Sequence, residues 1–143
     1  MKIKQISVFL ENKKGRLYEA LKELGDKNIN IRALSIADTS EFGVLRMIVD
    51  KPEEAKKALE DAGFTTKINN VVAVEVSDTP GGLAKALYYL YQADINIEYV
   101  YAFVEKSGEN AVVVLRTNNL DKAIDVLKNN GVKLLSWEDI LKL

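Results

Sequence analysis

The strongest constraint on this chain is that its second half repeats its first. The segments "ENKKGRLYEALKEL" at 11–24 and "SDTPGGLAKALYYL" at 77–90 share a glycine, a leucine and a helical apolar pattern, and "INI" follows both. One constant displacement joins Gly15 to Gly81, Leu17 to Leu83, Ala20 to Ala86, Leu21 to Leu87 and Leu24 to Leu90. After "EKSGEN" at 105–110 a slightly longer displacement joins Ala55 to Ala123, Leu59 to Leu127 and Gly63 to Gly131. A repeat that persists through two helical patterns and is reset at a turn predicts an internal duplication.

Both copies predict the same order of elements. Alternating β-rich segments predict strands, and apolar residues at helical spacing predict helices. The first copy then has strands at 4–11, 29–38 and 43–50, helices at 17–24 and 51–64, and a short strand at 65–69. The second copy has strands at 71–77, 95–105, 110–117 and 133–137, helices at 81–93 and 119–130, and a short tail or helical turn to 143. The order βαββαβ, twice, predicts an α+β fold: two tandem ferredoxin-like units with antiparallel sheets and helices on one face. We place the domains at 1–70 and 71–143, with almost no linker.

The second face of each sheet is unusually apolar. In "INIEYVYAF" strict alternation assigns Ile95, Ile97, Tyr99, Tyr101 and Phe103 to one face, and Val100, Ala102 and Val104 to the other. A sheet with one face in water alternates more cleanly. We therefore expect cover on both faces, from the other copy or from another chain, and hence a homodimer.

The loop "DTPGGL" at 78–83 follows a strand and opens a helix. Asp78 or Thr79 is expected to cap that helix, with Pro80 in its first turn. Gly81 and Gly82 would leave backbone N–H groups unshielded at the positive end of the helix, which suits a carboxylate or a phosphate. A tight strand-to-helix turn also favours glycine without any ligand, so the loop alone leaves both explanations open.

The composition excludes several classes of function. The chain has no cysteine and no histidine, so it has no disulfide, no thiolate or imidazole metal ligand and no cysteine nucleophile. No phosphate-binding loop, zinc spacing, dinucleotide fingerprint or nucleophile elbow appears, and we expect no metal and no cofactor. The net charge of −1 provides no basic field for nucleic acid or an acidic membrane. No apolar run approaches a membrane span, and the amino terminus is typical of a first strand in a cytoplasmic protein.

RNA binding is the alternative that the fold itself raises. RNA-binding domains of this topology stack bases on aromatic side chains of the central strands. Tyr99, Tyr101 and Phe103 could mimic this in the second copy, but Ala33, Ser35 and Ala37 stand there in the first. The basic aromatic motif is missing as well, so we expect no nucleic-acid partner.

The loop "DTPGGL", the helix after it and "ADINI" at the next strand, repeated as a βαββαβ unit, resemble the ACT domain, and "KQISVFLENKKGRL" strengthens the match. The resemblance covers nearly the whole chain as two copies and is close to stand-alone tandem ACT proteins without a catalytic domain. It implies a regulatory module that binds a small molecule and is attached to, or partnered with, enzymes of amino-acid metabolism. In this family two units pair side by side, and an amino acid lies between the glycine loop of one and the second strand of the other.

Carried onto this chain, the resemblance implies two pseudo-symmetric pockets. One would join Asn12, Gly15, Arg16 and Leu17 to Asn96 and Ile97. The other would join Asp78, Pro80, Gly81, Gly82 and Leu83 to Asn30 and Ile31. The α-carboxylate of an amino acid would take N–H groups at the helix start, and its ammonium group would take Asp78 or Asn12.

The first copy departs from the family pattern because Asn12 and Lys14 replace Asp78 and Pro80. The two pockets are therefore expected to differ in affinity, or one to be empty. Asn30 and Asn96 are equally typical of turns before strands.

The sequence thus predicts a non-enzymatic, cytoplasmic sensor or regulator that binds a free amino acid as a homodimer. An enzyme of amino-acid metabolism is its expected partner. The alternative is an interaction module whose pockets no longer bind and whose apolar sheet face docks such an enzyme.

Overall fold

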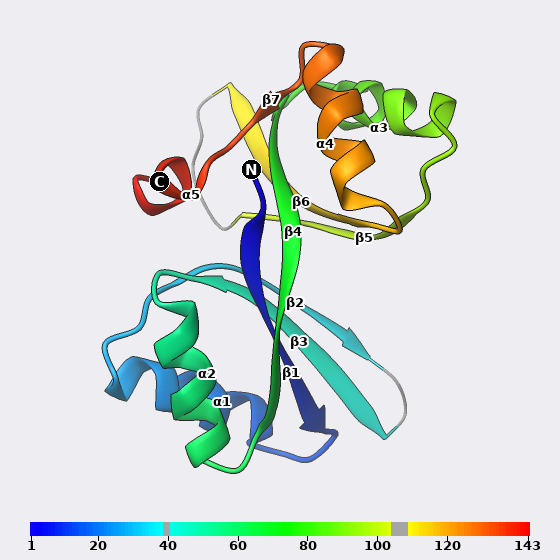
Figure 1. Cartoon of the computed structure of the whole chain (residues 1–143). Helices are drawn as coiled ribbons and strands as arrows, with labels where there is room; N and C mark the ends of the chain where they lie inside the picture. The colour runs from blue at the N-terminus through cyan, green and yellow to red at the C-terminus, as the bar shows by residue number, and fades with distance from the viewer. Residues whose placement is uncertain (39–40, 104–108) are drawn as a thin grey trace. The chain divides into compact units, whose positions relative to one another are not determined.

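The computed structural model describes residues 1–38, 41–103 and 109–143, and the chain divides into two compact units (Figure 1). The first unit comprises Lys4–Asn69. The second unit comprises Asn70–Leu143 together with Met1–Ile3. Residues 39–40 of the segment "TSEFG" at 39–43, and residues 105–108 of "EKSGEN" at 105–110, lie outside the described residues.

The first unit is a four-stranded sheet with two helices on one face (Figure 1). Its elements are β1 (Ile3–Glu11), α1 (Arg16–Asp26), β2 (Ile31–Asp38), β3 (Phe42–Val49), α2 (Pro52–Asp61) and the first part of β4 (Thr65–Ser77). The strand order is β2-β3-β1-β4, and β3 pairs antiparallel with both β1 and β2. Alternate residues of β1 and β3 supply apolar side chains to a core shared with α1 and α2, which includes Ile6, Val8, Leu10, Ala20, Leu24, Leu45, Met47, Ala55 and Leu59.

The second unit repeats this arrangement. It contains the rest of β4, then α3 (Gly82–Gln92), β5 (Ile97–Ala102), β6 (Asn110–Thr117), α4 (Leu120–Asn129), β7 (Lys133–Leu134) and α5 (Trp137–Leu141). The strand order is β7-β4-β6-β5, and the pairs are antiparallel. Its core includes Val72, Val74, Ala86, Leu90, Val113, Leu115, Ala123 and Leu127. The predicted α+β fold of two ferredoxin-like units is confirmed, with α1 and α2 on one face of the first sheet and α3 and α4 on one face of the second (Figure 1).

The strand that joins the two copies is continuous. Two short strands, at 65–69 and 71–77, were expected, but β4 runs without a break from Thr65 to Ser77. Its first part belongs to the first unit, and its last part belongs to the second. The chain therefore passes from one copy to the next inside a strand and has no linker at this point.

The duplication extends to single backbone angles. Asn28 and Asp94, which are equivalent positions of the repeat, have φ of 59° and 58°, a conformation uncommon outside glycine. Gly63 and Gly131 end α2 and α4 with φ of 91° and 76°, as expected for the residue after a helix. Matching sequence positions thus adopt matching backbone conformations in the two units.

A β-bulge lies near the start of both β2 and β5. The pairing register shifts between Ile31 and Ala33 in one strand and between Ile97 and Tyr99 in the other. Each bulge therefore reverses which face the following side chains occupy.

Because of the bulge in β5, the prediction of which residues of "INIEYVYAF" share a face of the sheet is wrong. Ile97 packs against the core beneath α3 and α4, but Tyr99 pairs with Arg116, the neighbour of core residue Leu115. Tyr99 and Tyr101 therefore lie on the face away from the helices, where their rings stack with centroids 6.4 Å apart. One face holding Ile95, Ile97, Tyr99, Tyr101 and Phe103 is not formed, because the extra residue breaks the alternation.

The carboxyl-terminal segment gives the second unit a further helix. The strand expected at 133–137 ends at Leu134, because Ser136 caps α5 in a reciprocal capping box with Asp139. Ile140 of α5 is fully buried, and α5 lies across the sheet from α3 and α4 (Figure 1). The second face of this sheet therefore receives cover from within the unit.

Candidate functional site

Both glycine loops bend the chain in the same way. Gly15 before α1 and Gly81 before α3 occupy the left-handed region, with φ of 88° and 83°. One backbone N–H···O=C bond closes each loop, from Gly82 to Thr79 at 2.9 Å and from Arg16 to Lys13 at 3.2 Å. Glycine adopts the left-handed conformation without strain, so these two residues set how the chain enters each helix.

The predicted helix cap is wrong. Gly81 is the capping residue of α3, and no side chain accepts a hydrogen bond there, so neither Asp78 nor Thr79 caps the helix. The Thr79 hydroxyl instead lies 2.9 Å from the Ser77 hydroxyl, and Pro80 precedes the helix rather than entering its first turn. The left-handed glycine turns the loop away from a side-chain cap, so the first N–H groups of α3 have no side-chain acceptor.

Asn12 and Asp78 anchor the loops through their backbones. The Asn12 N–H donates to the Glu41 carbonyl at 3.0 Å, and the Asp78 N–H donates to the Glu109 carbonyl at 2.9 Å. Both side chains belong to exposed residues. The N–H groups of these exposed residues thus hold the loop against the neighbouring hairpin.

Gly82 has a steric requirement of its own. A Cβ atom at this position would lie 2.0 Å from the Ser77 carbonyl oxygen, far inside contact distance. The second glycine of "PGGL" is therefore needed for the close approach of α3 to the end of β4. This is a structural reason for the residue that requires no ligand.

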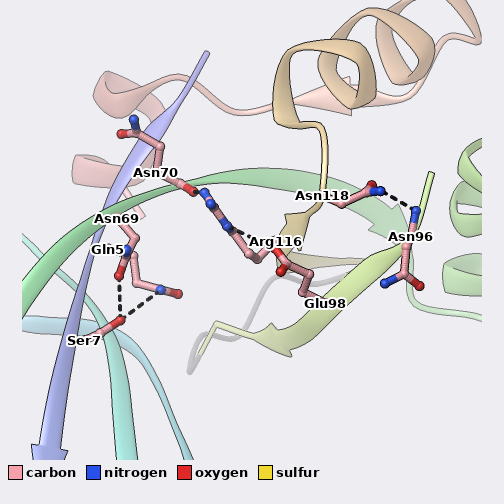
Figure 2. A network of polar contacts seen from close by, with 8 residues as sticks. All are labelled: Gln5, Ser7, Asn69, Asn70, Asn96, Glu98, Arg116 and Asn118. Carbon is pink, nitrogen blue, oxygen red and sulfur yellow. Dashed lines mark hydrogen bonds and ion pairs between the residues drawn. The ribbon is translucent and has the colours of Figure 1, made fainter.

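The strand starts are also anchored in the same way. The Asn30 N–H donates to the Asp50 carboxylate at 3.0 Å, and the Asn96 N–H donates to the Asn118 amide oxygen at 3.1 Å (Figure 2). In return, the Asp50 and Asn118 N–H groups donate to the carbonyls of Asn30 and Asn96. Asp50 and Asn118 hold equivalent positions in the two copies and were not singled out from the sequence. Their position directly after the third strand of each copy was the signal available.

Within each unit, the glycine loop and the strand start lie at opposite ends of the sheet. In the first unit Glu11 pairs with Phe42 at one end of β3, and Ile31 pairs with Val49 at the other. In the second unit Ser77 and Ile97 pair with opposite ends of β6 in the same way. Neither unit alone brings its own loop and strand start together, and their pairing across units stays a prediction.

A hollow of about 510 Å³ lies beside the glycine loop of the second unit. We call it the α3 hollow. It is lined by the end of β4 (75–77), the loop at 79–82, the turn at 130–133, and Lys85, Ala86 and Tyr89 of α3. Three predicted site residues, Pro80, Gly81 and Gly82, are in its wall, and Asp78 and Leu83 are not. Lys85, Tyr89 and the 130–133 turn were missed from the sequence, because only the fold brings the end of α4 beside the start of α3.

The α3 hollow carries charges of both signs. The Lys133 ammonium lies 3.6 Å from a carboxylate oxygen of Glu75, whose side chain is 27% exposed. Lys85 forms no ion pair with a carboxylate among the described residues. The hollow therefore combines one neutralised pair with one additional cation.

The first unit has a smaller pocket of about 100 Å³ at its loop. Asn12 and Leu17 line it, with Leu10, Glu11, Lys13, Ile36 and Gly43. The Lys13 ammonium lies 2.9 Å from the Glu11 carboxylate and, by hydrogen bonding, lowers the pKa of that exposed group. Gly15 and Arg16 are not in the wall of this pocket.

Arg16 lies elsewhere in the first unit. Its guanidinium carbon is 4.2 Å from the centroid of the Phe64 ring, and the group forms an ion pair with Glu19 at 2.8 Å. In the repeat, Arg16 and Phe64 correspond to Gly82 and Val132, which both line the α3 hollow. In the first copy, the Arg16 guanidinium stacked on Phe64 thus lies at positions equivalent to two residues of the hollow's wall.

Comparison with known proteins decides the family. A family model described as "ACT domain pair" matches residues 1–143. The chain belongs to the ACT domain family. No curated protein matches the chain.

Solved structures show the same architecture for this ACT domain pair. Protein BT0572 from Bacteroides thetaiotaomicron is 46% identical over 100% of this chain and 98% of its own, with a TM-score of 0.93. The ligand-free regulatory subunit of aspartate kinase from Thermus thermophilus is 16% identical over 88% of this chain and 91% of its own, with a TM-score of 0.66. The corresponding subunit from Thermus flavus is 17% identical over 88% and 90%, with a TM-score of 0.62. At these identities the two aspartate kinase subunits share the fold with this chain.

Polar contacts also fix the strands of each ACT unit away from the loops (Figure 2). In the first unit the Ser7 hydroxyl donates to the Asn69 side-chain oxygen at 2.8 Å. In the second unit Arg116 donates to the Asn70 carbonyl at 2.5 Å and pairs with Glu98 at 3.4 Å. Glu98, the acid that pairs with Arg116, is the bulge residue of β5.

The part of the chain that the structure describes gathers no three carboxylate, histidine or cysteine groups around a possible metal position. Among the same residues, no helix has the length and apolar character needed to cross a bilayer.

Proposed function

We propose that this ACT domain pair is a non-catalytic, cytoplasmic regulator that binds a free amino acid, with ACT-like domains at 1–70 and 71–143. The observation that carries the proposal is the match to an ACT domain pair over the whole chain, together with two glycine loops of the same backbone geometry. The Thermus proteins of the same fold are regulatory subunits of aspartate kinase. An enzyme of amino-acid metabolism is accordingly the partner that we propose.

The proposed binding residues belong to two sets. In one, Asp78, Pro80, Gly81, Gly82 and Leu83 act with Asn30 and Ile31. In the other, Asn12, Gly15, Arg16 and Leu17 act with Asn96 and Ile97. The Gly82 N–H already donates to the Thr79 carbonyl at 2.9 Å, and the lack of a side-chain cap on α3 supports a carboxylate at the N–H groups that follow it. The exposed Asp78 carboxylate is the proposed partner of the α-ammonium group.

Thermal unfolding with each of the twenty amino acids at millimolar concentration tests the proposal. A ligand that binds only the folded chain adds RT ln(1 + [L]/Kd), which is about 2.7 kcal/mol at a hundredfold excess over Kd. We expect one amino acid, or a chemically related set, to raise the Tm of the wild type. Asp78→Ala should abolish this rise, and Asp125→Ala, an exposed acid on α4, should retain it.

No rise in Tm with any amino acid would contradict amino-acid binding. That result would favour the interaction module, whose partner could then be sought by affinity capture.

The homodimer is a further part of the proposal. Phe9 and Phe42 are 42% and 52% exposed, and the register of β1 and β3 places both on the sheet face away from α1 and α2. Two exposed phenylalanines on one face favour a protein partner, and we propose a second copy. Sedimentation velocity should give a dimer for the wild type, and Phe9→Ser with Phe42→Ser should shift it toward monomer. Tyr18→Ser, which changes an exposed residue of α1, should leave the dimer intact, and a wild-type monomer would contradict the proposal.

A further inference from the structure

The two glycine loops differ in one respect that the duplication does not predict. Beside the second loop the α3 hollow is open, with a volume of about 510 Å³. At the corresponding position of the first unit, the Arg16 guanidinium lies on the Phe64 ring. Arg16 Nε is buried there and has no hydrogen-bond partner among the described residues. The arginine therefore occupies this space by stacking and by its ion pair rather than by a full set of hydrogen bonds.

The charge beside this space is reversed between the two copies. In the first unit Glu19 provides the carboxylate that pairs with Arg16, at 2.8 Å. In the second unit the equivalent position of the repeat is Lys85, which lines the α3 hollow. In the first unit the cation Arg16 is thus paired with the anion Glu19, whereas in the second unit the cation Lys85 lies beside the open hollow. The complementary occupant of the second space is an anion.

The hollow also limits the size and the chemistry of that occupant. Its volume falls in the range of about 300–1,000 Å³ that is typical of small-molecule sites. Tyr89 and Val132 supply apolar wall, and Asn130 supplies a polar group. Lys133 is already paired with Glu75, at 3.6 Å, which leaves Lys85 as the cation without a carboxylate partner among the described residues. One added cation favours a single negative charge.

We propose that the α3 hollow binds a small carboxylate at Lys85, one molecule per chain, and that Arg16 closes the equivalent site in the first unit. The Glu75 carboxylate lines the hollow and is paired with Lys133 at 3.6 Å, but its remaining acceptor sites would take an ammonium group if the bound carboxylate belongs to an amino acid. Every residue of this site comes from the second unit, so the site does not require Asn30 or Ile31. The inference rests on the proposed function in that the two sites share Pro80, Gly81 and Gly82.

Amide chemical shifts of the ¹⁵N-labelled full chain test the proposal. The probes are acetate, as the smallest organic carboxylate after formate, and each of the twenty amino acids. We expect a saturable shift at the 81–86 and 130–133 amides with at least one probe, and no saturable shift at Arg16 or Phe64. Lys85→Glu should raise the Kd of that probe about tenfold or more, because it replaces the attraction between Lys85 and the probe's carboxylate by a repulsion. Lys67→Glu makes the same charge change at an exposed residue of β4 and should leave Kd unchanged.

The outcomes separate this site from the proposed function. Binding of acetate in the hollow without binding of any amino acid would support the carboxylate site and contradict the amino-acid function. Amino-acid binding that shifts Asn30 and Ile31 and is unchanged in Lys85→Glu would support the function and overturn the carboxylate site. Saturable binding at Arg16 and Phe64 in the wild type would overturn the closure of the first unit. No saturable shift with any probe would overturn the site itself.

Discussion

The two adjacent glycines of "PGGL" have different physical tasks. Gly81 occupies the left-handed region, with φ of 83°, and so has a conformational reason to be glycine. Gly82 is helical, but the Ser77 carbonyl oxygen lies where its Cβ would be. The sequence showed that this loop needs glycine, but it could not distinguish these two reasons. The first copy has Arg16 in the place of Gly82, so the close approach is particular to the second unit.

We expect Gly82→Ala to destabilise the chain by about 1–3 kcal/mol, because the new methyl group must displace backbone. Gly25→Ala is the matched control: Gly25 is in α1, and a Cβ there meets nothing within 4 Å. The control should be stabilising by about 0.5–1 kcal/mol, because alanine favours the helix over glycine. Urea unfolding measures both free energies. Equal stability of Gly82→Ala and the wild type would show that the loop relaxes without cost.

The identity of the residues also did not predict which residue caps α3 or which side chains hold the starts of β2 and β5. Asp78 and Thr79 have good capping side chains, but the left-handed Gly81 after them takes the capping position. Asn30 and Asn96 were recognised only as residues before a strand. Their partners Asp50 and Asn118 lie across the sheet, and pairing of this kind depends on the fold.

At the scale of the element, periodicity predicted most helices and strands, and failed where an extra residue or a local cap intervened. The bulges in β2 and β5 reverse the faces of the residues after them. Pairing with the neighbouring strand decides such a bulge, and a single strand's alternation contains no sign of it. The helix α5 is the opposite case, since "SWED" has the capping-box pattern of serine followed three residues later by an acid.

The capping box of α5 predicts a dependence on pH. Hydrogen bonds from the Ser136 backbone and side chain lower the pKa of Asp139 below its ordinary value of 3.8. Because the pKa is lower in the folded chain, the stabilisation is fully present above the ordinary value and is lost as the pH falls through the folded value. We expect the environment of Trp137, the single tryptophan, to change in acid below about pH 4.

Fluorescence of Trp137 between pH 7 and pH 2 checks this expectation. Asp139→Asn removes the titrating group, so its fluorescence should depend less on pH than that of the wild type. Asp125→Asn removes an exposed acid of α4 and should behave like the wild type. The same acid transition in Asp139→Asn and in the wild type would assign the change to other carboxylates, such as Glu53, whose pKa Lys4 lowers.

At the scale of the whole molecule, the repeat predicted the fold because each copy has the same apolar pattern and the same turn residues. The sequence predicted that the two pockets differ in affinity, because Asn12 and Lys14 of the first copy replace Asp78 and Pro80 of the second. In the structure the difference beside the loops comes from Arg16 and Phe64 against Gly82 and Val132. Residues 64 and 132 follow the second helix of each copy, and only folding brings them beside the glycine loop.

The central claim is that this ACT domain pair binds a free amino acid in its folded state. Isothermal titration calorimetry of the full chain with each of the twenty amino acids tests it most directly, because it measures Kd and stoichiometry together. The account predicts a saturable heat for one amino acid or one related set, which Asp78→Ala abolishes and Asp125→Ala does not. The absence of a saturable heat with all twenty would contradict it.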